Sequence, residues 1–305
     1  MTLKRYILSS YKGFTLLELM VTTGMLVLIS AMVGGAIVAQ KKLYVAEVVR
    51  TKSNQDLRGI FNLVSSEIRL AGEKLPSTFP AILLTNGSNG APDTLTIRRN
   101  ILDTVLKLCS NLNNGTTTSN INFSLSRTTS NPTPPACVYN NNESNYQKWL
   151  EHYNDNSGGT QRAYVYKETD KSGQFFNFNG IVKTSSIYRL TGTGNTWNSS
   201  YSRNNSSIYL LEEWQLTIVD NKLRLINGQN TSEFLNLASD ISDFQVQIEM
   251  QDGSVRNTFT TSQNWTDIAN IQITIESEGT HSGKVIKRSA SSKFFPRNIL
   301  SLYGS

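Results

Sequence analysis

One uninterrupted apolar run constrains this chain more than any other feature. Residues 14–38 form a 25-residue stretch in which Glu18 is the single charged side chain. A helix of that length measures about 37 Å, enough to cross the hydrocarbon core of a bilayer. The run is too long for the apolar part of an ordinary secretory signal, and no Ala-x-Ala site follows it. We therefore expect residues 14–38 to form a transmembrane helix.

The same helix is expected to continue beyond the membrane. Through residues 39–75 apolar side chains recur at helical spacing while charged ones fill the other face. The first proline is Pro76, and Gly72 stands where a helix C-cap often places glycine. The segment 57–71 cannot hide its apolar stripe alone, so a sheet must cover it.

The charge distribution sets the expected orientation. The chain has 29 basic and 23 acidic residues, a net charge of +6. Three basic residues lie in the polar segment 1–13, which holds no acid: Lys4, Arg5 and Lys12. Basic residues stay on the cytoplasmic side, so the downstream chain is expected outside, although Lys41 and Lys42 oppose this weakly. Without segment 1–13 the chain has 26 basic and 23 acidic residues. This small excess of positive charge gives no firm indication of nucleic-acid binding.

Residues 76–305 are expected to form one β-rich head domain. They are rich in Asn, Ser and Thr, and short runs of β-forming residues alternate with turn signals. Candidate strands lie at 81–84, 94–98, 121–125, 163–166, 181–183, 187–190, 208–211, 214–219, 222–226, 244–250, 268–275 and 284–288. Two low-complexity stretches, 110–135 and 191–206, are predicted to be loops. The expected fold is α+β: a long N-terminal helix packed on an antiparallel β-sheet head.

The two cysteines, Cys109 and Cys137, are expected to form a disulfide. The membrane segment sends them out of the cytoplasm, where disulfides persist. The alternative is two free thiols. Closing a loop of this length stabilises a fold by about 3–4 kcal/mol in the chain-entropy model.

No catalytic, cofactor or metal site is predicted. The two histidines, His152 and His281, lie in no HExxH motif, and no Cys/His cluster has zinc spacing. No P-loop, GxSxG or GxGxxG motif is present. Turn-like aspartates do not make the EF-hand pattern. These observations argue against an enzyme.

The most specific motif spans the start of the apolar run. Lys12-Gly13-Phe14-Thr15-Leu16-Leu17-Glu18-Leu19 resembles the prepilin cleavage and methylation motif of type IV pilins and type II pseudopilins. The resemblance implies that a leader, residues 1–13, is cut after Gly13 and that Phe14 becomes an N-methylated terminus. A carboxylate inside a membrane helix is costly and needs a partner. The resemblance implies that Glu18 meets the N-terminal amine of its own or a neighbouring subunit and so drives assembly.

The same resemblance implies partners and a location. The partners are prepilin peptidase, other minor and major pilins, an inner-membrane assembly platform and the lipid bilayer. The prepilin would sit in the bacterial inner membrane by a single span, with its N-terminus cytoplasmic before cleavage. The head would be periplasmic and later displayed in a pilus at the cell surface.

Shorter segments elsewhere are similar to the W-type minor pilins. They include Arg69-Leu-Ala-Gly72, Pro92-Asp-Thr-Leu-Thr-Ile97 and Phe295-Pro-Arg-Asn298. This similarity implies a minor pilin at or near the filament tip that primes assembly. Two alternatives stay open: a J-like minor pseudopilin of a type II secretion system, or a tip adhesin or DNA-uptake module that binds through loops near 110–160 and 191–206.

Overall fold

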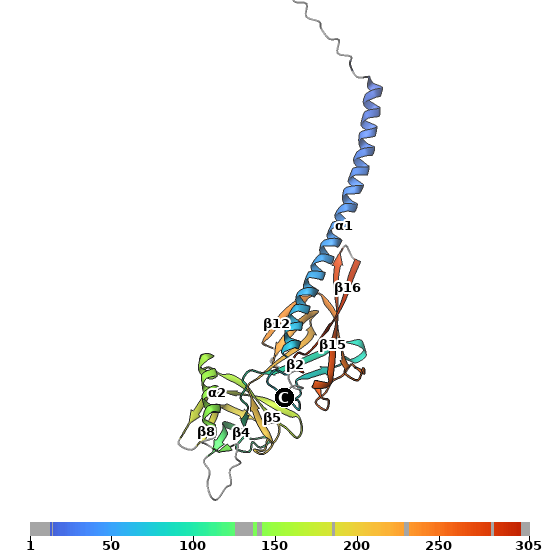
Figure 1. The fold of residues 1–305 in the computed structure, drawn as a ribbon. Coiled ribbons are helices and arrows are strands. Elements are labelled where there is room, and N and C mark those ends of the chain that lie inside the picture. The colour runs from blue at the N-terminus through green and yellow to red at the C-terminus, as the bar shows by residue number, and fades with distance from the viewer. Residues whose placement is uncertain are drawn as a thin grey trace, which may run out of the picture.

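The computed structural model describes residues 13, 15–125, 137–138, 142–184, 187–228, 232–281 and 284–299. Phe14 and most of the predicted leader lie outside the described residues. A long helix, α1 (Leu16–Leu70), projects as an arm from a β-rich head, and only its last part lies against strands (Figure 1). The prediction of an α+β chain with antiparallel sheets is confirmed at this level.

Helix α1 begins and ends where its sequence provides caps. Thr15 and Glu18 form a capping box at the start, which satisfies helix N–H groups that lack a partner within the helix. At the other end Gly72 has φ +75, and a Cβ there would lie 2.0 Å from the ring of Trp265. Asn298 donates to the carbonyls of Arg69 and Ala71 at 3.2 and 3.1 Å. The helix therefore ends at Leu70, just before the glycine that the sequence indicated.

The body of the head consists of two antiparallel sheets that cover the end of α1. The first has the order β1-β2-β10-β11-β12, with bounds Ile82–Thr85, Thr94–Asn100, Leu211–Val219, Lys222–Asn227 and Phe234–Ser239. The second has the order β14-β13-β15-β16, with bounds Val255–Arg256, Ile241–Met250, Ile268–His281 and Lys284–Phe294. Short 3-10 turns occur at Ser88–Gly90 and Trp265–Asp267. The buried side chains of α1 are Leu57, Ile60, Val64 and Ile68, and they share one core with both sheets. The predicted burial of segment 57–71 is confirmed.

Residues 101–210 form an insertion, which we call the inserted module. Strands β2 and β10 are hydrogen-bonded neighbours, with Asn100 opposite Leu211, although 110 residues separate them. The Ile101 N–H donates to the Leu210 carbonyl at 3.0 Å, so the chain leaves and re-enters the body at one place. In Figure 1 the module, with α2, β4 and β8, occupies the end of the head away from the free part of α1.

The inserted module has its own elements and its own core. One sheet has the order β3-β9-β5-β6, with bounds Leu106–Lys107, Ser206–Tyr209, Gln161–Lys167 and Ser172–Phe178. A second has the order β4-β8-β7, with bounds Thr117–Leu125, Ile187–Thr196 and Gly180–Lys183. Helix α2 (Glu143–Asp155) buries Tyr146 and Trp149 in the same apolar cluster. The apolar core of the head is thus divided into two clusters.

Strand β5 forms the wall between these two clusters. Ala163 and Val165 face the core of the module, whereas Tyr164 and Tyr166 face the core of the body. Phe79 of the body lies 4.5 Å from Tyr166, measured between ring centroids. Both faces of β5 are therefore buried, as its unbroken run of four buried residues requires.

Two predictions about the module were wrong. Strands extend into both stretches predicted as loops: β4 starts four residues before the predicted strand 121–125, and β8 runs six residues beyond the predicted strand 187–190. Threonine fits a pleated sheet well, and Ile121 and Phe123 anchor β4 in the core. Helix α2 was missed, although its apolar side chains follow helical spacing, because asparagines surround and interrupt them.

The expected pairing of the cysteines is present. Cys109 and Cys137 form a disulfide, with a Cα–Cα distance of 5.6 Å and both residues 1% exposed. Cys109 follows β3, and its backbone N–H donates to the backbone carbonyl of Asn122 in β4. The bond therefore ties Cys137 to the strands of the inserted module.

Removing this disulfide should destabilise the inserted module. We expect the double variant Cys109→Ser/Cys137→Ser to lower the free energy of unfolding by about 3 kcal/mol, because the unfolded chain regains loop entropy. Urea unfolding of the full chain, oxidised against double variant, measures this. Thiol labelling on non-reducing gels checks the bond itself, and two alkylatable thiols in the folded wild-type protein would contradict it.

Candidate functional site

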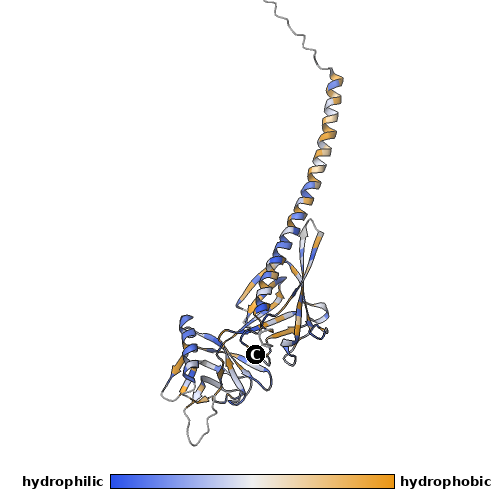
Figure 2. Ribbon diagram, viewed as in Figure 1, coloured by the Kyte–Doolittle hydropathy of each residue, from blue (hydrophilic) through white to orange (hydrophobic). Residues whose placement is uncertain are grey.

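The N-terminal part of α1 is an apolar surface that the rest of the described chain does not cover. Every residue from Thr15 to Leu43 is exposed, including Leu16 at 77%, Met32 at 78% and Leu43 at 71%. Figure 2 shows the hydrophobic colours gathered along this free part of the helix. Among the described residues, α1 is the one helix long and apolar enough to cross a membrane. Removing each large apolar side chain from water is worth about 1.5–3 kcal/mol, so this surface requires a lipid or protein environment.

The free arm ends where α1 meets the head. Leu43, Tyr44 and Val48 are still exposed, whereas Val49 lies against Gly279 of β15. Ser53 then hydrogen-bonds Ser277 of the same strand. About 33 residues, or roughly 50 Å of helix, therefore extend away from the head. That is more than one membrane thickness.

Glu18 lies one turn from the start of this arm. Its Oε2 accepts from the Thr15 N–H and from the Thr15 hydroxyl, both at 3.0 Å, and the Glu18 N–H donates to Thr15 Oγ1 at 3.2 Å. The hydroxyls of Thr22 and Thr23 are satisfied by helix carbonyls one turn back. In a single chain the carboxylate therefore caps its own helix. It stays exposed, and its negative charge has no cationic partner among the described residues.

Three glycines of the arm are not required by any close contact within the described chain. A Cβ added at Gly24, Gly34 or Gly35 would meet nothing within 4 Å. Each glycine costs a helix about 1 kcal/mol relative to alanine in water, and in membranes such residues allow helices to approach closely. At these three positions the surface of the arm therefore carries no side chain that would keep another helix at a distance.

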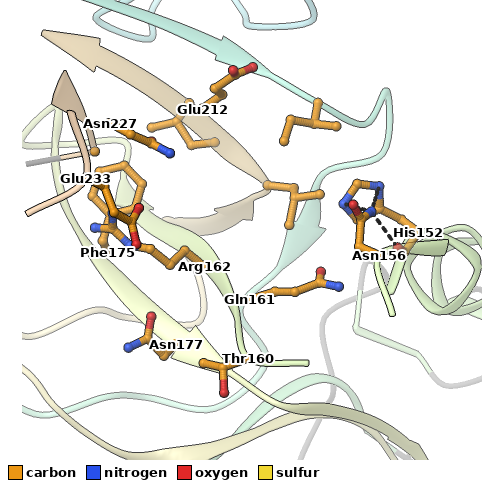
Figure 3. Close-up of a pocket in the computed structure, with 14 residues that line it drawn as sticks. His152, Asn156, Thr160, Gln161, Arg162, Phe175, Asn177, Glu212, Asn227 and Glu233 are labelled. Atoms are coloured by element: carbon orange, nitrogen blue, oxygen red, sulfur yellow. Dashed lines mark hydrogen bonds between the residues drawn. The ribbon is translucent and has the colours of Figure 1, made fainter. Parts of the chain in front are cut away.

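The head carries a separate large cleft between the inserted module and the body. Its volume is about 920 Å³, and its walls come from α2, β5 and β6 on one side and from β10, β11 and Glu233 on the other (Figure 3). Arg162 lies over the ring of Phe175 at 4.3 Å, and Glu212 is paired with Arg99 at 2.5 Å. Burial lowers the pKa of His152, which favours its neutral imidazole. The His152 ring lies within hydrogen-bond distance of the Asn156 side-chain amide in this cleft (Figure 3).

The predicted site residues fall into three places. Gly13 is exposed directly before the arm, Glu18 lies in its first turn, and the Cys109–Cys137 pair lies in the distant inserted module. Phe14 is outside the described residues. The part of the chain that the structure describes contains no group of three or more His, Cys, Asp or Glu side chains suited to a metal. No sequence pattern indicated the cleft, because its walls come from segments that are far apart in the chain and meet only in the folded head.

No family model matches this chain, and no curated protein or solved structure matches it either. Fold and site define the chain as an α+β protein with one long apolar N-terminal helix. That helix is consistent with a single-pass membrane anchor.

Proposed function

We propose that this chain is a type IV pilin-like subunit, most similar to the W-type minor pilins, which primes filament assembly at or near the tip. The observation that carries this proposal is the free apolar arm with its lone carboxylate, Glu18, one turn from its start. A plain membrane anchor needs neither a charge there nor the exposed glycines of the arm. Both are useful to a helix that leaves lipid and packs among identical or related helices.

The order of motifs along the chain supports this proposal. The basic leader, Gly13, Phe14 and Glu18 match the prepilin motif, and the arm begins two residues after Phe14. The segment Phe295-Pro-Arg-Asn298, which resembles the W-type minor pilins, supplies the amide that caps the end of α1. The subunit would enter the inner membrane as a prepilin, be cut by prepilin peptidase and join other pilins through the assembly platform.

Processing is the direct test of the proposal. We expect the protein purified from cells that contain prepilin peptidase to start at methylated Phe14, because Gly13 and Phe14 form the cleavage site. Intact mass and N-terminal sequencing measure this, with Gly13→Leu as the control that keeps the leader. A protein that still starts at Met1 in the presence of the peptidase would contradict the proposal. Recovery of secretion pseudopilins in place of pilins during co-purification would support the J-like alternative.

The inserted module favours a second candidate, a binding module at the filament tip. The module is a separate core at the end of the head away from the arm, and it borders the 920 Å³ cleft. Because Asn100 and Leu211 are direct neighbours, residues 101–210 can be replaced by a two-residue Asn-Gly turn. A priming subunit lacking the module should still form filaments, at reduced stability because Phe79 loses its aromatic cover.

Filament counts and surface-binding assays on this deletion separate the two candidates. Filaments that form but no longer bind cells, surfaces or DNA would establish the adhesive alternative. Unchanged binding would remove it. An absence of filaments, with the deleted protein still folded in the membrane, would place the priming function in the module.

A further inference from the structure

A second, smaller cleft lies on the face of β5 and β6 that is turned toward the body. In this part of the sheet Tyr164 lies opposite Phe175, and Tyr166 lies opposite Gly173. The cleft has a volume of about 350 Å³ and is closed on the body side by Arg98 of β2 and by Thr261. The stacked Arg162 and Phe175 line both clefts and separate this one from the larger one.

The charges that line this smaller cleft are of one sign. Arg98, Arg162 and Lys171 line it, and no carboxylate does. Arg98 is already paired with Glu213, through Nε at 2.6 Å. Arg162 and Lys171 are both half-buried, and neither has a carboxylate within 4.0 Å among the described residues. Two partly desolvated cations without carboxylate partners favour an anion in the cleft that both of them line.

An unpartnered hydroxyl provides an independent observation at the same place. Tyr164 is 5% exposed, lines the cleft, and its hydroxyl has no hydrogen-bond partner among the described residues. Burial raises the pKa of Tyr164, so its hydroxyl keeps its proton and can donate. Gly173 makes room for the ring, because a Cβ there would lie 2.5 Å from Tyr164 Cε1 and 2.2 Å from the Val165 carbonyl. The Tyr164 hydroxyl therefore has a proton to donate to a ligand in the cleft that it lines.

We propose that this cleft binds the phosphate or sulfate group of a small molecule. Guanidinium, ammonium and hydroxyl donors approach it from β5, from the turn before β6 and from the body, and a tetrahedral oxyanion has acceptor oxygens in several directions. The volume is near the lower end of ligand sites, which suits a small ligand rather than a polymer threaded through the cleft. This site is separate from the arm of α1 and does not depend on the proposed function.

Titration of the full chain in an uncharged detergent tests the site. Calorimetry at constant ionic strength measures binding of inorganic phosphate, sulfate and acetate. We expect saturable binding of phosphate or sulfate, weakened about tenfold or more by Lys171→Gln and by Arg162→Gln. Tyr164→Phe should weaken binding several-fold while the melting temperature stays close to that of the wild type, because the ring remains in place.

Lys222→Gln is the matched control, since it removes the same charge from an exposed position on β11. It should leave the affinity unchanged. An absence of saturable binding, or equal weakening by Lys171→Gln and Lys222→Gln, would overturn the site. Acetate binding as tightly as phosphate and sulfate would overturn the assignment to a tetrahedral oxyanion.

Discussion

Glu213→Ala is expected to destabilise the head by about 3–5 kcal/mol, because it leaves the Arg98 guanidinium buried without its partner. Glu213 is 0% exposed and the Arg98 side chain is 7% exposed. The two residues face each other across β2 and β10, next to the point where the inserted module leaves the body. Urea unfolding of the full chain, followed by fluorescence, measures the loss.

The neighbouring ion pair supplies a matched control for this prediction. Arg99 and Glu212 occupy the next register position but remain 25% and 20% exposed, so Glu212→Ala should cost only about 1 kcal/mol. A double variant, Arg98→Met/Glu213→Leu, should recover most of the stability lost in Glu213→Ala, since it removes both buried charges. Equal losses of unfolding free energy in Glu213→Ala and Glu212→Ala would contradict the prediction, because the effect would then not depend on burial of the ion pair.

Glu18→Ala is expected to abolish or strongly reduce filament incorporation while leaving membrane insertion and cleavage intact. Insertion survives because the apolar run becomes more apolar, and cleavage survives because Gly13 remains. Assembly suffers because, in the proposed function, the carboxylate pairs with an N-terminal ammonium inside the helical bundle. Leaving one partner of a buried pair alone costs about 3–5 kcal/mol. Filament counts and co-purification with partner pilins measure the effect.

Two further variants separate the charge of Glu18 from its capping of α1. Glu18→Gln keeps a side-chain oxygen for the Thr15 N–H but loses the charge, whereas Thr15→Ala loses the capping hydroxyl and keeps the charge. A charge-dependent assembly step predicts that Glu18→Gln fails and Thr15→Ala assembles. If instead Glu18→Gln assembles and Thr15→Ala fails, the role of Glu18 is to cap α1 and its charge is not needed for assembly.

A subunit at the very tip has no neighbour beyond it and would show a milder effect. Wild-type piliation together with wild-type partner recovery in Glu18→Ala would therefore argue for a tip position, or for an anchored protein that never enters a filament.

The sequence by itself determined the features that depend on neighbouring residues. Helical periodicity without proline predicted α1, and Gly72 marked its end because only glycine adopts φ +75 readily beside Trp265. The stripe within 57–71 predicted which part of α1 would be buried. The chain has two cysteines, so the sequence alone determines that an intramolecular disulfide can only join Cys109 and Cys137.

Only the tertiary structure decided the features that depend on residues far apart in the chain. Nothing local in Thr94–Asn100 indicates that its partner begins at Leu211, since many strands offer the same backbone groups. That pairing created the inserted module, buried both faces of β5 and placed Glu213 opposite Arg98. The Asn- and Thr-rich segments of β4 and β8 have only a weak local preference for strand structure. They form strands because they pair with each other and pack in the core of the inserted module.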